Sequence, residues 1–298
     1  MKPEYALPVL MRAGLGNMLM PWGRAIVWAL GHNACVLAPR WFKMRVGPYR
    51  RREFDKRRYE RSFTKTGYVT GVERLIVLAR GTFVGEGAEP SRSGFPTVVR
   101  FEGLGSFLDP LLGHHETLDR RLRQMTRPEL LPPSDDDFVG VHVRMGDYPT
   151  AWRLPIEWYV DVVRELRTQL DTSIPVRIFS DGPDDELAPL LRLPDVIRRR
   201  DRAAVTDLLE LSQAACIVPS ASTFSAWAGF LRQAPMLWHP GRTMRSHHDD
   251  QMRKCLEWDT RSPLPESMLI EVARRLASDP ISAWTDRSAP DAPPTDPN

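Results

Sequence analysis

The stretch Phe138-Val-Gly-Val-His-Val-Arg-Met-Gly-Asp-Tyr148 decides the predicted fold. Valines at positions 139, 141 and 143 give it the pattern of a buried parallel strand. The strand ends in a polar cluster of His142, Arg144 and Asp147, with Gly146 allowing a tight turn. Ligands of open α/β sheets bind beyond the carboxyl ends of the strands, so the cluster is predicted to face a ligand. The alternative is an ordinary strand whose arginine and aspartate form a salt bridge.

Around this segment, predicted strands alternate with predicted helices. In the second half of the chain the strands are 138–143, 176–179, 215–218 and 236–238, and the helices are 155–170, 183–193, 201–214, 223–233 and 267–277. In the first half, strands are expected at 9–11, 35–38, 75–79 and 97–101, with a helix at 18–30 and a helix-rich segment at 103–134. The alternation predicts an α/β fold.

The chain is expected to form two domains and a tail. A polar, proline-containing connection, Leu131-Pro-Pro-Ser-Asp-Asp-Asp137, separates an N-terminal domain, 1–134, from a C-terminal domain, 135–277. Residues 278–298 are rich in Pro, Asp, Ser and Ala with little to bury, which predicts a disordered tail.

Composition narrows the class of protein. With 298 residues, 42% apolar and 27% charged, the chain is of globular type. Its cysteines, Cys35, Cys216 and Cys255, show no CxxC spacing, which argues against a disulfide scaffold or a zinc site. The N-terminus does not resemble a signal peptide, and the longest apolar stretch, Leu19 to Leu30, is too short to span a bilayer. A cytoplasmic protein is expected, with peripheral contact to the inner membrane as an option.

One segment is strongly basic. Between Arg40 and Lys65 there are eleven Lys or Arg residues and three acids, interleaved with aromatic residues. This pattern fits a solvated helix, a surface for an anionic glycan, lipid-linked acceptor or membrane, or a nucleic-acid patch. We favour the solvated helix and expect no nucleic-acid partner.

A second polar cluster, Ser220-Ala-Ser-Thr-Phe-Ser225, connects a predicted strand to a predicted helix. Ser222 or Thr223 is a natural N-cap, so the simplest interpretation is a capped helix. The same free N–H groups, together with hydroxyls at 222, 223 and 225, would also form a phosphate cradle.

Two further segments have weaker signals. Ile178-Phe-Ser-Asp-Gly-Pro183 places Asp181 at a strand end, where it could hold a loop or contact a ribose. Gly14-Leu-Gly-Asn17 is a glycine turn without a complete P-loop or dinucleotide motif. No metal is predicted, because adjacent residues such as His247-His-Asp-Asp250 rarely all face one ion.

Together the four segments resemble the α-1,2-fucosyltransferases of glycosyltransferase family 11 and their α-1,6 and protein O-fucosyltransferase relatives. His-x-Arg-x-Gly-Asp-Tyr is similar to the family's His-x-Arg-Arg-Gly-Asp-Tyr, with Met145 at the second arginine. The block from Asp207 to Trp227 is similar to its Asp-x-x-x-Leu-Ser…Asn-Ser-Thr-Phe-Ser-Trp-Trp, with Ala226 before the tryptophan. Gly182 replaces a second acid of Phe-Ser-Asp-Asp, and Gly14-Leu-Gly-Asn17 is similar to the opening Gly-Gly-Leu-Gly-Asn-Gln.

The resemblance implies a GT-B fold, in which two Rossmann-like domains face a cleft, and an inverting transfer of fucose from GDP-fucose to a glycan or glycolipid hydroxyl. The C-terminal domain would hold the donor, the N-terminal domain the acceptor, and neither metal nor cofactor would be needed. Arg144 would bind the β-phosphate, His142 and Asp207 the guanine, and the turn of Ser222, Thr223, Phe224 and Ser225 the pyrophosphate. Asp147 is the candidate base, Asp181 a donor-side residue, and Gly14, Gly16 and Asn17 would line the cleft.

Two alternatives stay open at this point. The same fold could use a different nucleotide sugar. The chain could instead be a non-catalytic protein that binds nucleic acid or another anion through the basic segment 40–65.

Overall fold

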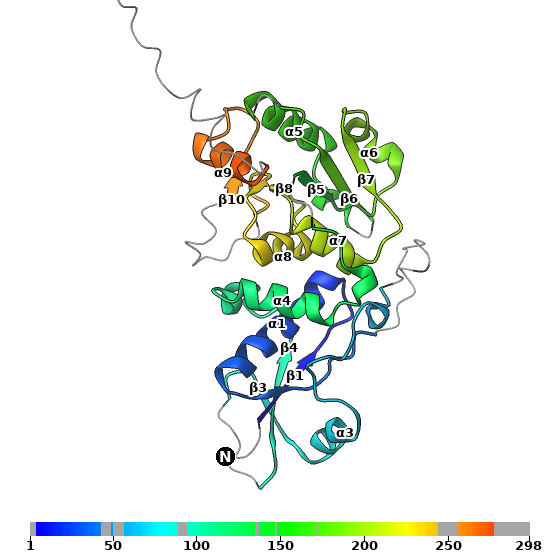
Figure 1. Cartoon of the computed structure of the whole chain (residues 1–298), viewed down its shortest axis with the longest axis vertical. Coiled ribbons are helices and arrows are strands. Elements are labelled where there is room, and N and C mark those ends of the chain that lie inside the picture. The colour runs from blue at the N-terminus through cyan, green and yellow to red at the C-terminus, as the bar shows by residue number, and fades with distance from the viewer. Residues whose placement is uncertain are drawn as a thin grey trace, which may run out of the picture.

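The computed structural model describes residues 4–42, 49, 57–88, 94–134, 137–146, 148–170, 172–243 and 255–276. Within these residues the chain forms two parallel sheets, with helices between the sheets and on their outer faces (Figure 1). This arrangement confirms the predicted α/β class. The tail, 278–298, lies outside the described residues.

The first sheet has the strand order β2-β1-β4-β3, and all its neighbours are parallel. Its strands are β1 (Glu4–Val9), β2 (Cys35–Val36), β3 (Thr82–Gly85) and β4 (Thr97–Glu102). Helices α1 (Leu15–Gly31) and α4 (His115–Met125) pack on one face, and α3 (Gly71–Arg80) packs on the other. Short 3-10 turns lie at Tyr59–Arg61, Asp109–Leu111, Pro128–Leu130 and, in the second half, Thr150–Trp152.

The second sheet has the order β10-β9-β8-β5-β6-β7 and is also parallel throughout. Its strands are β5 (Val139–Val143), β6 (Val176–Ser180), β7 (Val196–Arg199), β8 (Cys216–Val218), β9 (Met236–Trp238) and β10 (Cys255–Glu257). From β5 the chain moves outward to β6 and β7, and then crosses to β8 on the other side of β5. The strand order therefore reverses between β5 and β8, which is where open α/β sheets bind ligands.

Helices cover both faces of the second sheet. They are α5 (Ile156–Leu170), α6 (Asp184–Leu191), α7 (Ala204–Leu211), α8 (Thr223–Arg232) and α9 (Glu266–Leu276). The valines of β5 pack with α5, α6 and α9 in one apolar cluster, whereas α7 and α8 pack on the opposite face. Because β5 is buried on both faces, it reads in the sequence as a nearly continuous apolar run.

The two halves share one buried apolar cluster, which α1 and α4 of the first half form with α7 and α8 of the second (Figure 1). The rings of Trp22 and Trp227 lie 6.3 Å apart, and His115 meets Phe230 edge-on at the same centroid distance. Thr206 also donates a hydrogen bond of 2.8 Å to the carbonyl oxygen of Leu130. The junction is therefore packed like a domain core.

Several predicted elements differ from the structure. Residues 75–79, predicted as a strand, belong to helix α3, because a short apolar run does not distinguish a buried strand from a helix. The first strand lies at Glu4–Val9 instead of 9–11. Strands β3, β7 and β10 were not predicted; they are only three or four residues long.

The basic segment is only partly described. Residues 43–48 and 50–56 lie outside the described residues. On either side of that gap, Trp41, Tyr59 and Phe63 are buried in the shared cluster, so these flanks are anchored in the core and do not belong to a fully solvated helix. Among the residues that the structure describes, no helix is both long enough and apolar enough to cross a bilayer.

We expect Trp227→Ala to lower the free energy of unfolding by about 3–5 kcal/mol, because the truncation leaves a cavity at the junction of the two halves. Trp227 is fully buried, whereas Trp152 is 55% exposed and serves as the control. Trp152→Ala should cost less than about 0.5 kcal/mol. Urea denaturation measures both, and a loss below about 1 kcal/mol for Trp227→Ala would contradict a tightly packed junction.

Candidate functional site

A cluster of hydroxyl groups surrounds one histidine where the strand order of the second sheet reverses. His142, on β5, is 7% exposed, and its Nδ1 lies 2.6 Å from Ser225 Oγ and 3.0 Å from Ser220 Oγ. Ser222 Oγ lies 3.4 Å from the same nitrogen. The imidazole also packs on the ring of Phe224, with centroids 4.9 Å apart. The structure thus brings together predicted residues from two segments about 80 positions apart.

The serines owe their positions to the start of helix α8. Ser222 is the N-cap, and its Oγ accepts a hydrogen bond of 3.3 Å from the backbone N–H of Ser225. The first N–H groups of a helix have no partner within the helix, and the helix dipole makes that end positive. The start of α8 is therefore suited to an anion.

His142 is neutral at physiological pH. Burial, reinforced by the nearby charge of Arg144, lowers the pKa of His142 to about 3, and the opposing charge of Asp181 does not offset this. A neutral imidazole whose Nδ1 accepts a hydroxyl hydrogen carries its own hydrogen on Nε2. His142 can then act as a hydrogen-bond donor without adding a charge to the site.

Asp181 organises the loop that follows β5. Its Oδ1 accepts hydrogen bonds from the backbone N–H groups of Met145 and Gly146, at 2.8 and 3.1 Å. Its Oδ2 pairs with the guanidinium of Arg144, which is about one quarter exposed. Asp181 therefore holds the loop and Arg144, the first of the two roles considered from the sequence.

Met145 packs in the apolar core of the second half. Its side chain is buried, and a Cβ atom on Gly182 would collide with its thioether. Two of the departures from the family motifs, Met145 and Gly182, are thus packed against each other.

The first half of the chain meets the start of α8 directly. A Cβ atom on Gly16 would lie 2.7 Å from the backbone nitrogen of Phe224, so only glycine fits there. Thr223 Oγ1 donates a hydrogen bond of 2.5 Å to Asn17 Oδ1. By contrast, a Cβ atom on Gly14 would meet no heavy atom within 4 Å. Gly16 and Asn17 join the two halves, and Gly14 faces open space beside them.

Asp207 belongs to a separate cluster of charges on α7. Its Oδ1 lies 3.6 Å from Nε of Arg202, which also pairs with the buried carboxylate of Glu210. Glu210 further accepts hydrogen bonds from Arg177 at 3.0 Å and Arg199 at 2.8 Å. A buried carboxylate with three arginines fixes the position of Arg202, and through it that of Asp207.

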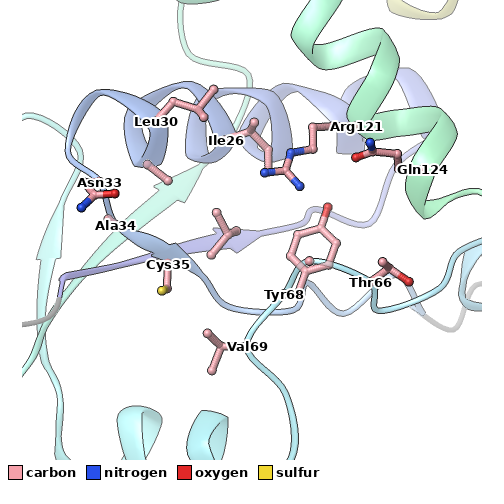
Figure 2. A pocket seen from close by; sticks show the side chains of 13 residues that line it. Ile26, Leu30, Asn33, Ala34, Cys35, Thr66, Tyr68, Val69, Arg121 and Gln124 are labelled. Atoms are coloured by element: carbon pink, nitrogen blue, oxygen red, sulfur yellow. The ribbon is translucent and has the colours of Figure 1, made fainter.

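A cavity of about 350 Å³ lies elsewhere, among α1, β2, α4 and the loop before α3 (Figure 2). Ile26, Cys35, Val69 and Gln124 line it, and Figure 2 shows the side chains of Tyr68 and Arg121 on either side of it. Along α1, Ile26 is ten residues from Gly16, or about 15 Å. We place the functional site at the hydroxyl cluster instead, because charged and hydrogen-bonding groups from both halves converge there.

Comparisons with known proteins support the fold. The NodZ α-1,6-fucosyltransferase structure soaked with GDP-fucose matches with a TM-score of 0.50 at 15% identity, over 80% of this chain and 96% of that chain. NodZ from Bradyrhizobium gives 0.49 at 15% identity, over 81% and 96% of the chains. POFUT1 in complex with GDP-fucose gives 0.45 at 12% identity, over 80% and 97%. The first match confirms the predicted GT-B-like fold; at 15% identity it concerns the fold alone. No family model matches this chain. No curated protein matches it either.

Two site residues were not selected from the sequence. Ser220 contributes a hydroxyl to His142, and Tyr148 donates a hydrogen bond to the carbonyl oxygen of Ala221, so the loops after β5 and β8 are tied together. Both residues belong to the motifs quoted above, so these motifs were the sequence signal that could have identified them. Asp147, the predicted base, lies outside the described residues, as does the run from His247 to Asp250. Within the described residues, no group of three or more His, Cys, Asp or Glu side chains is placed to hold a metal ion.

The low pKa of His142 predicts a pH-dependent loss of stability. Below the ordinary histidine pKa of about 6.5, His142 binds a proton in the unfolded chain but stays neutral in the native state. The free energy of unfolding therefore falls as the pH falls. From pH 7.5 to pH 5.0 the free energy of unfolding should fall by about 2 kcal/mol more in the wild type than in His142→Asn, because asparagine cannot titrate. Urea titrations at the two pH values measure this difference. Equal losses in both proteins would show that His142 is not buried in a neutral form.

Proposed function

We propose that this chain is a glycosyltransferase that moves fucose from GDP-fucose to a hydroxyl group of a glycan or glycolipid, with inversion at the sugar carbon. The observation that carries the proposal is that the loop with Arg144 and the N-terminus of α8, which contacts His142 through Ser225, both lie where the strand order reverses. Both groups favour an anion, and the planar fork of an arginine matches the oxygens of a phosphate. The shared fold with NodZ crystals soaked with GDP-fucose supports this donor.

In the proposed reaction an acceptor oxygen bonds to the anomeric carbon of fucose while the bond from that carbon to the β-phosphate oxygen breaks. GDP leaves with that electron pair, and the proton of the acceptor hydroxyl passes to a base. Arg144 and the N–H groups of α8 would stabilise the charge that develops on the departing phosphate. Such fixed dipoles need no rearrangement as the bond breaks. Asp147 remains our candidate base.

Of the other site residues, some would contact the donor and others would position the residues that do. By resemblance, His142 and Asp207 would recognise the guanine, and the turn Ser222–Ser225 would wrap the pyrophosphate. The neutral His142 suits a hydrogen bond to a base edge or a phosphate oxygen. Asp181 would act through Arg144, and Asn17 through Thr223, so we regard both as positioning residues.

The acceptor and the linkage rest on the resemblance. An α-1,2 linkage is proposed from the motifs of glycosyltransferase family 11, whereas NodZ is an α-1,6-fucosyltransferase. The fold alone does not distinguish an α-1,2 from an α-1,6 linkage, because surface contacts of the first half would select the acceptor hydroxyl. We also propose that the basic segment 40–65 attracts an anionic acceptor or the surface of a membrane.

Donor choice tests the proposal directly. GDP and GDP-fucose should raise the melting temperature more than UDP or dTDP sugars do, and the shift should persist in EDTA because Arg144 and α8 supply the positive charge. A shift with UDP-sugars alone would identify the alternative donor class and reject the fucosyltransferase proposal. Tight, strongly salt-dependent binding of an oligonucleotide, without any nucleotide shift, would favour a nucleic-acid-binding protein.

Replacing Arg144 separates binding from chemistry. Arg144→Ala should cost about 3–5 kcal/mol of transition-state stabilisation, the scale for losing a fixed charged donor. Arg144→Lys should recover little, because a lysine lacks the planar fork and would not keep the same contact with Asp181. The measurement is kcat/KM for transfer or for GDP-fucose hydrolysis. Arg164→Ala, at an exposed position on α5, is the control and should be unaffected. Normal turnover by a folded Arg144→Ala protein would reject the role of Arg144.

A further inference from the structure

Helix α3 carries apolar residues on two opposite sides. On the inner side, Val77 and Leu78 pack against the first sheet, with Tyr5 and Val98. On the outer side, the exposed fractions of three large residues are 71% for Val72, 63% for Leu75 and 50% for Ile76. With exposed Ala79 they follow the spacing i, i+3, i+4, i+7, so they form one stripe along the helix. A helix on the surface of a globular protein usually turns a polar face outward, and this one does not.

The exposed apolar surface continues from the helix onto the edge of the sheet. Phe83, on edge strand β3, is 43% exposed and pairs in register with Val98. Residues in register on neighbouring parallel strands point to the same face of a sheet, and Val98 packs beneath α3. Phe83 therefore lies on the α3 side. Val72, Leu75, Ile76, Ala79 and Phe83 together form what we call the α3 face.

Positive charges flank the α3 face. Arg74 lies on the inner side of the helix, where it donates a hydrogen bond of 3.1 Å to the carbonyl oxygen of Ala38, and burial, followed by the charge of Arg40, lowers the pKa of Arg74. Arg40 and Arg80 are exposed, and within the described residues neither forms an ion pair. The acidic residue of the helix is Glu73, which interacts with Tyr5 on the sheet. The surroundings of the stripe therefore have an excess of positive charge.

We propose that the α3 face docks on an anionic lipid surface. The helix would lie in the plane of the interface with its stripe at the boundary between headgroups and acyl chains, and the exposed Arg40 and Arg80 would contact lipid phosphates. A two-fold contact between copies of this chain would instead bring these arginines toward each other, which like charges oppose. Because α3 lies on the side of the first sheet that faces away from the second, docking leaves the hydroxyl cluster uncovered (Figure 1).

Vesicle co-sedimentation of the full chain tests this proposal. Vesicles of phosphatidylcholine alone are compared with vesicles containing about one third phosphatidylglycerol, at low and high salt. We expect binding to the anionic vesicles only, weakened by salt. Leu75→Glu with Ile76→Glu should reduce that binding by about tenfold or more, because two charges enter the stripe. The matched control is Ile197→Glu with Ile270→Glu, two exposed residues of the second half, which should leave binding within about twofold of the wild type.

The outcomes are distinct. Unchanged binding of the α3 variant, or no binding of the wild type to either vesicle, overturns the proposal. A dimer in light scattering that Leu75→Glu with Ile76→Glu converts to a monomer, without vesicle binding, would identify the α3 face as an interface between copies and also overturns it. The circular dichroism spectrum and the rise in melting temperature with GDP should be preserved in both variants. If GDP did not raise the melting temperature of the wild type, the proposed donor would be rejected. The proposal for the α3 face would not be affected.

Discussion

The approach of α1 to α8 is the contact on which the rest of the structure depends. At Gly16 the backbone of the first half lies so close to Thr223 and Phe224 that no side chain fits between them. The hydrogen bond between Asn17 and Thr223 fixes the register of this approach, and the tryptophan pair Trp22 and Trp227 fills the space behind it. The same few residues of α8 therefore serve the junction and the candidate site. A change in the junction would therefore move the N-terminal end of α8.

The positive potential at this site comes from Arg144 and the N–H groups of α8. Keeping these groups charged or oriented requires little free energy. The buried histidine stays neutral, so it adds hydrogen-bonding capacity without the penalty of a buried charge. Arg144 keeps about a quarter of its side chain exposed and has Asp181 beside it. The N–H groups of α8 contribute fixed dipoles. In the proposed function, the phosphate of the donor would meet groups that are already oriented, which is the condition for electrostatic catalysis.

Met145 and Gly182 show how a motif can change in a coupled way. Each of the two residues departs from the family pattern when its motif is read alone. In the structure the methionine fills the space that the glycine leaves, inside the core. Apolar packing there stabilises the loop that carries Arg144. The cationic group available to a ligand in this loop is then Arg144 itself, within the described residues.

The sequence by itself determined the elements with strong local signals. The valines of β5, the N-cap at Ser222 and the apolar spacing of α5 and α8 each depend on neighbouring residues, and these elements lie close to where they were predicted. The resemblance of four motifs pointed to the GT-B fold, and the fold comparison confirmed it. Residue roles at the site stay predictions, since no ligand contact tests them.

Tertiary structure alone decided the rest. The apolar run at 75–79 became a helix because it covers a sheet face with Val77 and Leu78, and no local pattern distinguishes that outcome from a strand. The capture of the loop after β5 by Asp181 and the three arginines around Glu210 join residues 8 to 36 positions apart. The order of the strands joins residues that are farther apart, such as Val139 and Cys216. Local sequence specifies backbone conformation and caps. Which side chains meet across a sheet is set by the packing of the whole chain, because the most stable arrangement is the one that buries most apolar faces and pairs most buried charges at once.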